Sequence, residues 1–228
     1  MNTEHKKALI SYLFDFISDQ RKKRFLEIIE YRTRHVTVVL EDIFQAQNAS
    51  AVLRTCDCFG IQDVHAIETK NKFDVNRDIA LGSTQWLNLY KHKGEGNNTI
   101  KCLNTLKDKG YKIIATSPYK NGHTIEELPL DNKTALVFGT ELEGITDDVK
   151  NMADGFVTVP MFGFTESFNI SVSAALALYT LTNRLHKSEI KWQLTDEEKD
   201  DILLKWQRNT INKVELIEKE FLERMNRQ

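Results

Sequence analysis

Polar residues that could do chemistry fall in three short blocks, and each block follows a run of apolar residues. The first block holds Asn48 and Arg54, the second holds Glu141 close to two glycines, and the third holds Ser167 and Asn169. Amide, hydroxyl and carboxylate groups can orient a polar substrate. An arginine can hold a phosphate or stabilise negative charge that develops on an oxygen.

The elements that must position these blocks are strands and helices in alternation. Strands are expected at residues 36–40, 64–67, 112–116, 135–138 and 156–159, with helices at 46–59 and 100–109 between them. This alternation predicts a parallel sheet covered on both faces. Because such sheets bind ligands beyond the carboxyl ends of their strands, the three blocks are expected to share one pocket.

Each block also has a plain structural interpretation. Asn48 could cap the helix that follows the first strand, and Arg54 could be an ordinary surface arginine. Glu141 could belong to a simple strand-to-helix turn, and Asn169 could cap the next helix. Capping does not explain the small residues at 171–177, which predict a second backbone segment passing close by.

Taken together and in this order, the three blocks resemble the signature motifs of the SpoU-type RNA ribose methyltransferases of the SPOUT superfamily. The likeness runs from about residue 20 to about residue 187. It is strongest to the TrmH subgroup, in the segments 21–25 and 37–60 and in Gly82-Ser83 followed by Trp86. That subgroup methylates the ribose 2′-hydroxyl of a guanosine in the D-loop of tRNA.

The resemblance implies an α/β fold: a Rossmann-like parallel sheet with a deep C-terminal trefoil knot, flanked by N- and C-terminal helices. Residues 1–34 would form a tRNA-binding helical extension, 35–187 the knotted methyltransferase domain and 188–228 a C-terminal helical extension. It further implies a homodimer that uses S-adenosylmethionine. By position, the cofactor contacts would be Thr116, Gly139, Val159, Met161 and Phe168.

The resemblance also assigns roles to the polar blocks. Arg54 would act on the 2′-hydroxyl, either as a general base or by stabilising charge. A guanidinium stays protonated in proteins, which favours holding a phosphate and stabilising the alkoxide. Asn48 would orient Arg54 or the ribose, Glu141 would fix Arg54 or the cofactor loop, and Ser167 with Asn169 would organise the pocket.

Charge and composition limit the kinds of binding partner that the protein is expected to have. The net charge of −2 does not by itself indicate a nucleic-acid-binding protein. A basic cluster is nevertheless expected to bind tRNA phosphates, the alternative being a solvated helix face; it consists of Arg21, Lys22, Lys23 and Arg24. No apolar stretch has membrane-spanning length and no signal peptide is evident, which predicts a cytoplasmic protein without a membrane partner.

The cysteines and the competing functions complete the sequence-based expectations. Cys56 and Cys58 lack the further ligands of a zinc motif, so we expect buried free thiols and no metal. The alternatives are the same chemistry on ribosomal RNA or at another tRNA position, and a non-catalytic RNA-binding module. A serine hydrolase using Ser167 is disfavoured, because no Gly-x-Ser-x-Gly sequence surrounds it.

Overall fold

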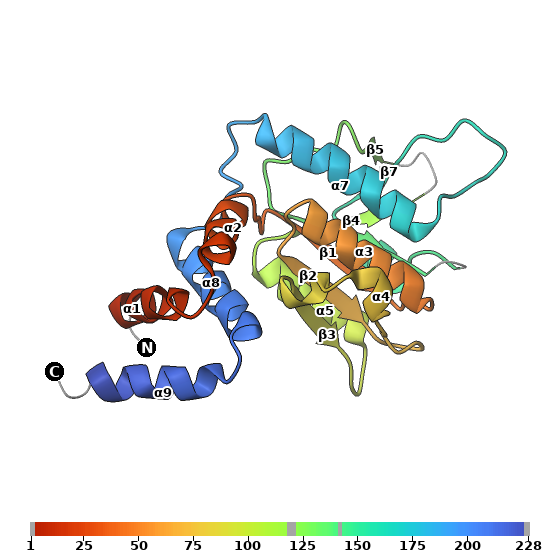
Figure 1. The fold of residues 1–228 in the computed structure, drawn as a ribbon. Coiled ribbons are helices and arrows are strands. Elements are labelled where there is room, and N and C mark those ends of the chain that lie inside the picture. The colour runs from red at the N-terminus through yellow and green to blue at the C-terminus, as the bar shows by residue number, and fades with distance from the viewer. Residues whose placement is uncertain (1–2, 118–121, 141–142, 226–228) are drawn as a thin grey trace. The chain divides into compact units, whose positions relative to one another are not determined.

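The computed structural model describes residues 3–117, 122–140 and 143–225. The chain folds into two compact units, shown in Figure 1. One unit joins the two ends of the chain, residues 1–32 and 193–228, and the other comprises residues 33–192.

Within the described residues of the larger unit, the strands form one seven-stranded sheet in the order β3-β2-β1-β6-β4-β7-β5. Every strand pairing in it is parallel. The strands are β1 (Val36–Glu41), β2 (Asp63–Ile67), β3 (Asn88–His92), β4 (Lys112–Thr116), β5 (His123–Thr124), β6 (Thr134–Phe138) and β7 (Gly155–Thr158). The predicted parallel α/β sheet is therefore confirmed.

Helices cover both faces of this sheet. On one face lie α3 (Ala46–Cys58) and α7 (Ile170–His186), which pack against each other, together with α4 (Arg77–Ala80) and the short 3₁₀ turn η1 (Ser83–Gln85). On the other face lie α5 (Asn98–Asp108) and α6 (Asp147–Met152). Neighbouring side chains of β1 alternate between the two cores: Val38 joins the α3–α7 core and Val39 the α5–α6 core.

Two strands and one cysteine differ from the expectations. β3 and β5 occupy the two edges of the sheet, where half-exposed strands need no continuous apolar run, so the sequence pattern did not predict them. Cys56 is buried as expected, and Cys102 is buried too, but Cys58 is exposed. Two steps along an α-helix rotate a side chain by about 200°, which turns Cys58 away from the core that holds Cys56.

The smaller unit is helical: α1 (Thr3–Phe14), α2 (Asp19–Ile29), α8 (Asp196–Thr210) and α9 (Val214–Met225). Trp206 is almost fully buried and contacts Phe25 edge to face. A capping box begins α8, with Thr195 as the N-cap residue and Glu198 as its partner. In the described part of the chain, no helix combines the length and the apolar character needed to cross a lipid bilayer.

Candidate active site at the carboxyl edge of the sheet

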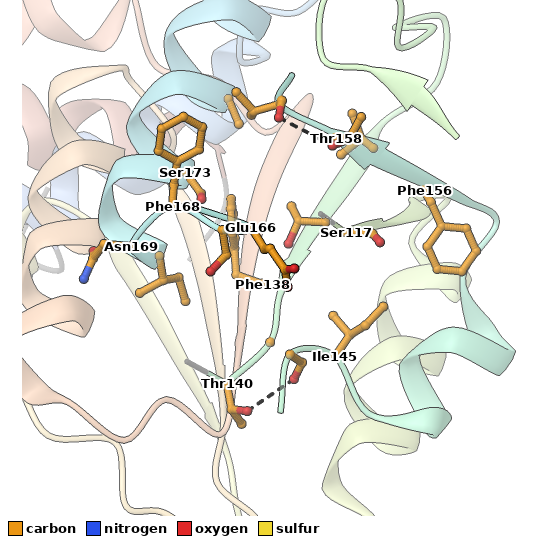
Figure 2. Close-up of a pocket in the computed structure, with 18 of the residues that line it drawn as sticks. Ser117, Phe138, Thr140, Ile145, Phe156, Thr158, Glu166, Phe168, Asn169 and Ser173 are labelled. Atoms are coloured by element: carbon orange, nitrogen blue, oxygen red, sulfur yellow. Dashed lines mark hydrogen bonds between the residues drawn. The ribbon is translucent and has the colours of Figure 1, made fainter. Parts of the chain in front are cut away.

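A cavity of about 770 Å³ opens beyond the carboxyl ends of β1, β4, β6 and β7. Figure 2 shows Phe168 and Asn169 on the α7 side of this cavity, Thr158 on β7, and Thr140 and Ile145 on the loop that follows β6. β1 and β6 are neighbours at the centre of the sheet although they are far apart in sequence. This is the kind of strand-order switch at which open α/β sheets bind ligands.

The structure brings most of the predicted site residues to this cavity. Those that line it are Asn48, Thr116, Gly139, Val159, Met161, Ser167, Phe168 and Asn169. Arg54 is exposed on α3 and is not among the described lining residues. Glu141 lies outside the described residues. The cavity therefore gathers parts of all three blocks. Arg54, the residue expected to act on the hydroxyl, is not among its described lining residues.

A chain of amide hydrogen bonds joins the first and third blocks. Asn169 caps α7, because its Oδ1 accepts from the backbone N–H of Ser171 at 2.8 Å and from the Ser171 hydroxyl at 2.6 Å. Its amide nitrogen, left as the donor, donates to Oδ1 of Asn48 at 3.1 Å. Asn48 in turn donates to Oε1 of Gln45 at 3.1 Å. These contacts fix the start of α7 against the start of α3.

Asn48 does not cap α3, contrary to the plain structural interpretation. The N-cap residue is Gln45, and Asn48 lies inside the first turn of the helix. Its side chain points at the third block instead. The residue is buried, with 6% of its surface exposed. A buried amide needs hydrogen-bonding partners, and Asn169 provides one of them.

The loop after β6 closes into a tight turn. Thr140 and Gly144 exchange two backbone hydrogen bonds, of 2.9 and 3.1 Å, across it. Gly144 has a φ of +70°, a conformation that glycine adopts without strain. A Cβ atom on Gly139 would lie only 2.2 Å from the carbonyl group of Gly144. The second block therefore needs glycine at both positions to keep this wall of the cavity in place.

Two buried carboxylates at the end of β1 hold the neighbouring loops. Glu41 accepts from the hydroxyl of Thr146 at 2.8 Å and from its backbone N–H at 3.1 Å, which anchors the end of the cavity loop. Asp42 accepts three backbone N–H groups, those of residues 69–71, at 2.8 to 2.9 Å. β1 thus supports both the cavity wall and the loop that follows β2.

Three charged residues that the sequence interpretation missed also line the cavity: Glu143, Lys150 and Glu166. Glu143 pairs with Lys70 at 3.3 Å and Lys150 with Asp147 at 2.8 Å. Glu166 directly precedes Ser167, so its place in the third block was the one available signal. The described lining of the cavity thus carries two carboxylates and one ammonium group.

A parallel α/β sheet with polar side chains around a cavity at its carboxyl edge defines a protein of the doubly wound, ligand-binding α/β class. The profile of the SpoU rRNA Methylase family matches residues 35–179, which is more than half of the chain. The chain belongs to this family.

Curated relatives match most of the chain. A tRNA (guanosine(18)-2′-O)-methyltransferase of Borreliella burgdorferi is 45% identical over 209 residues, which span 92% of this chain and 94% of the relative. A Thermus thermophilus protein of the same name is 30% identical over 162 residues, 71% of this chain and 81% of that one.

Solved structures share the fold. The TrmH/SpoU tRNA modifying enzyme of A. aeolicus superposes with a TM-score of 0.75 at 30% identity, over 86% of this chain and 98% of that one. The SpoU methyltransferase AviRb of Streptomyces viridochromogenes, in complex with the cofactor AdoMet, has a TM-score of 0.59 at 17% identity, over 72% and 65% of the two chains. At that identity the second likeness concerns the fold alone.

Proposed function

We propose that this protein is a tRNA (guanosine(18)-2′-O)-methyltransferase that transfers a methyl group from S-adenosylmethionine to the ribose 2′-hydroxyl of a D-loop guanosine. The proposal rests chiefly on the 45% identity to a relative of that name over 92% of the chain. The joining of Asn48 to Asn169 at the cavity supports it, because it unites two of the polar blocks that define the family resemblance. The deep trefoil knot is part of this proposal.

The cavity fits S-adenosylmethionine in size and in chemistry. Its volume of about 770 Å³ lies within the range of small-molecule sites. Apolar side chains of Val159, Met161 and Phe168 line it beside backbone groups of the Gly139 turn. Glu143 and Glu166 suit the positive charge of a sulfonium. When bound, this cofactor would supply a methyl group on a positively charged sulfur, a good leaving group.

The residues of this chain would position the acceptor and stabilise its charge. Asn48 and Asn169, held by their mutual hydrogen bond, would fix the cavity wall next to the ribose. Arg54, as a protonated guanidinium, would hold a phosphate of the RNA and stabilise the alkoxide forming on the 2′-oxygen, while the hydroxyl proton passes to solvent. Correct placement of the two reacting groups supplies much of the rate enhancement in such a transfer.

The experiment that tests the function supplies the purified protein with radiolabelled S-adenosylmethionine and total RNA. Label is expected in the tRNA fraction, at the D-loop guanosine. A tRNA with a 2′-deoxy nucleotide at that position should accept no label. Label confined to ribosomal RNA or to another tRNA position would assign a different substrate. Binding of RNA with neither methyl transfer nor cofactor binding would favour a non-catalytic RNA-binding module.

We also propose that the protein works as a homodimer formed through one face of α7. Val172, Leu176 and Tyr179 follow one another at helical spacing and are 43%, 38% and 59% exposed. Phe162 and Phe164, in the preceding loop, are almost fully exposed. Large apolar side chains exposed along one face of a helix often mark an interface. Because α3 packs against α7, a dimer formed here would bring Arg54 near the interface.

Leu176→Asp is expected to convert the dimer to a monomer, because it places a charge in the apolar face of α7. Light scattering coupled to size exclusion would measure the mass. Ile100→Asp on α5 is a matched control, since Ile100 is 37% exposed and Leu176 38%. The proposed interface is wrong if both variants keep the same mass, or if the unsubstituted protein is itself a monomer.

The basic cluster Arg21–Arg24 supports tRNA binding. It begins in the first turn of α2, where the helix dipole disfavours positive charge. Arg24 pairs with Glu27 at 3.2 Å, and the Lys22 ammonium lies 5.2 Å from the centre of the Phe14 ring. Arg21 and Lys23 are exposed. A cluster placed against the dipole is more readily explained by binding to phosphates than by helix stability.

Replacing all four basic residues with alanine is expected to weaken binding to every tRNA and to flatten its salt dependence. For every phosphate that the variant no longer binds, the slope of log K against log salt should fall by about 1. Filter binding at several salt concentrations measures this slope. An unchanged slope would identify the cluster as a solvated helix face.

A further inference from the structure

Three residues with metal-binding side chains converge on the α5 face of the sheet and do not line the cavity described above. They are His65 on β2, His92 on β3 and Cys102 on α5, and their ligand atoms all lie within 4.8 Å of one another. His65 and Cys102 are buried and His92 is partly buried. Nδ1 of His65 and Nε2 of His92 are 2.9 Å apart.

The sheet register explains why these residues meet. His65 lies opposite Tyr90, and Ile67 lies opposite His92, so the two histidines are diagonal neighbours on one face of the sheet. Cys102 belongs to the core under α5, together with Ile67. The cluster therefore links the edge strand β3 to its neighbour β2 and to the helix above them.

The two histidines are in the protonation state that a metal site needs. Burial lowers the pKa of His65 to about 3, and nearby His92 and Lys109 act in the same direction. Burial and then Lys109 also lower the pKa of His92. Both imidazoles are therefore neutral at pH 7, and each has a lone pair to offer. Burial, with a contribution from Glu41, raises the pKa of the Cys102 thiol to about 12.

We propose that His65, His92 and Cys102 bind a zinc ion through His65 Nδ1, His92 Nε2 and Cys102 Sγ. Two nitrogens and one sulfur are ligands that zinc prefers. Tetrahedral coordination, with bonds of about 2.0 to 2.3 Å, places ligand atoms about 3.4 Å apart. The two nitrogens would move slightly apart and the sulfur would move inward. A water molecule reaching past the partly buried His92 would complete the coordination.

The proton balance follows from these states. The imidazole that donates in the His65–His92 hydrogen bond would carry its proton on its other ring nitrogen, so neither histidine releases one. The Cys102 thiol would release its proton to solvent and bind as a thiolate. Zinc binding near pH 7 should therefore release one proton per ion. The thiolate and the nearby Glu41 carboxylate would together balance the two positive charges.

The role of this ion would be structural. In the described part of the sheet, β3 is an edge strand that pairs with β2 alone, and its residues are partly or largely exposed. A zinc ion shared by β2, β3 and α5 would tie this edge to the core. The expectation that the protein holds no metal is revised by this proposal, because Cys102 combines with two histidines rather than with Cys56 or Cys58.

The test uses the full-length protein, treated with a chelator and titrated with zinc alone. Calorimetry in two buffers of different ionisation enthalpy should give one ion per chain and one proton released. Cobalt, as an optical substitute, should show a sulfur-to-metal charge-transfer band. Zinc should also raise the melting temperature, a readout that does not depend on methyl transfer.

Cys102→Ser and His92→Ala should each weaken zinc binding at least tenfold and remove the cobalt band. Circular dichroism of the metal-free variants checks that they remain folded. Cys58→Ser, which removes the exposed thiol, is the control and should bind zinc like the unsubstituted protein. Failure to bind zinc, or equal binding by all these proteins, would overturn the proposal. Neither outcome would bear on the proposed methyltransferase activity.

Discussion

Gly139→Ala is expected to remove cofactor binding, and with it methyl transfer. The new Cβ atom would lie 2.2 Å from the carbonyl group of Gly144 and 2.3 Å from the backbone nitrogen of Ile145. Both contacts are with backbone, which cannot rotate away as a side chain can. Overpacking of this severity costs about 3 kcal/mol. The loop must shift, and it forms one wall of the cavity.

Calorimetry with S-adenosylmethionine measures the loss, which should exceed about a hundredfold in affinity if most of that cost falls on the bound state. Gly163→Ala is the matched control, because its added Cβ atom would come no nearer than 4.0 Å to Thr165. Circular dichroism separates a closed cavity from an unfolded protein. A Gly139→Ala variant that is folded and binds normally would show that this loop does not shape the cofactor site.

Arg54→Ala is expected to abolish methyl transfer while leaving cofactor affinity nearly unchanged. The side chain is exposed on α3 and is not among the described residues that line the cavity, so its loss should not disturb the bound cofactor. Removing one group that stabilises a developing oxyanion costs about 100- to 1,000-fold in rate. Single-turnover transfer to tRNA and calorimetry with the cofactor give the two readouts. A loss of cofactor affinity would contradict the assigned role.

The place of Arg54 within the proposed dimer can be tested with two inactive variants. If Arg54 of one subunit serves the cavity of the other, Arg54→Ala and Gly139→Ala subunits, once exchanged, should form one intact site per mixed dimer. Activity would then return on mixing. A mixture that stays inactive after proven subunit exchange would place Arg54 and the cavity that it serves in the same subunit.

The fold could be predicted where burial leaves a strong sequence signal. The strands β1, β2, β4, β6 and β7 are short apolar runs, and their predicted bounds differ from the observed ones by no more than a residue at either end. β3 and β5 were not predicted, because edge strands carry polar residues on their open side. A central strand can be recognised from its own apolar run. An edge strand can be recognised only when the strand that it pairs with is known, and a single sequence does not reveal that pairing.

The sequence was enough to predict that the three blocks converge on one site. It was not enough to predict which side chains contact one another there. Strand order brings Asn48 and Asn169 to one edge, while their direct hydrogen bond depends on how α3 and α7 pack. The exposure of Arg54 depends on how α3 is rotated about its own axis. The first block mixes polar and apolar residues, so its sequence does not define that rotation. The cluster of His65, His92 and Cys102 depends on a register with β3 that no pattern indicated.

The central pairing of the sheet also constrains the order in which the protein can mature during synthesis. β1 pairs with β6, so residues 36–40 meet residues 134–138, and Asn48 reaches its partner 121 positions later in the chain. Contacts of such long sequence separation form slowly. A nascent chain that still lacks α7 has no complete amide network. Competence to hold the cofactor would thus arise only after α7 has been synthesised.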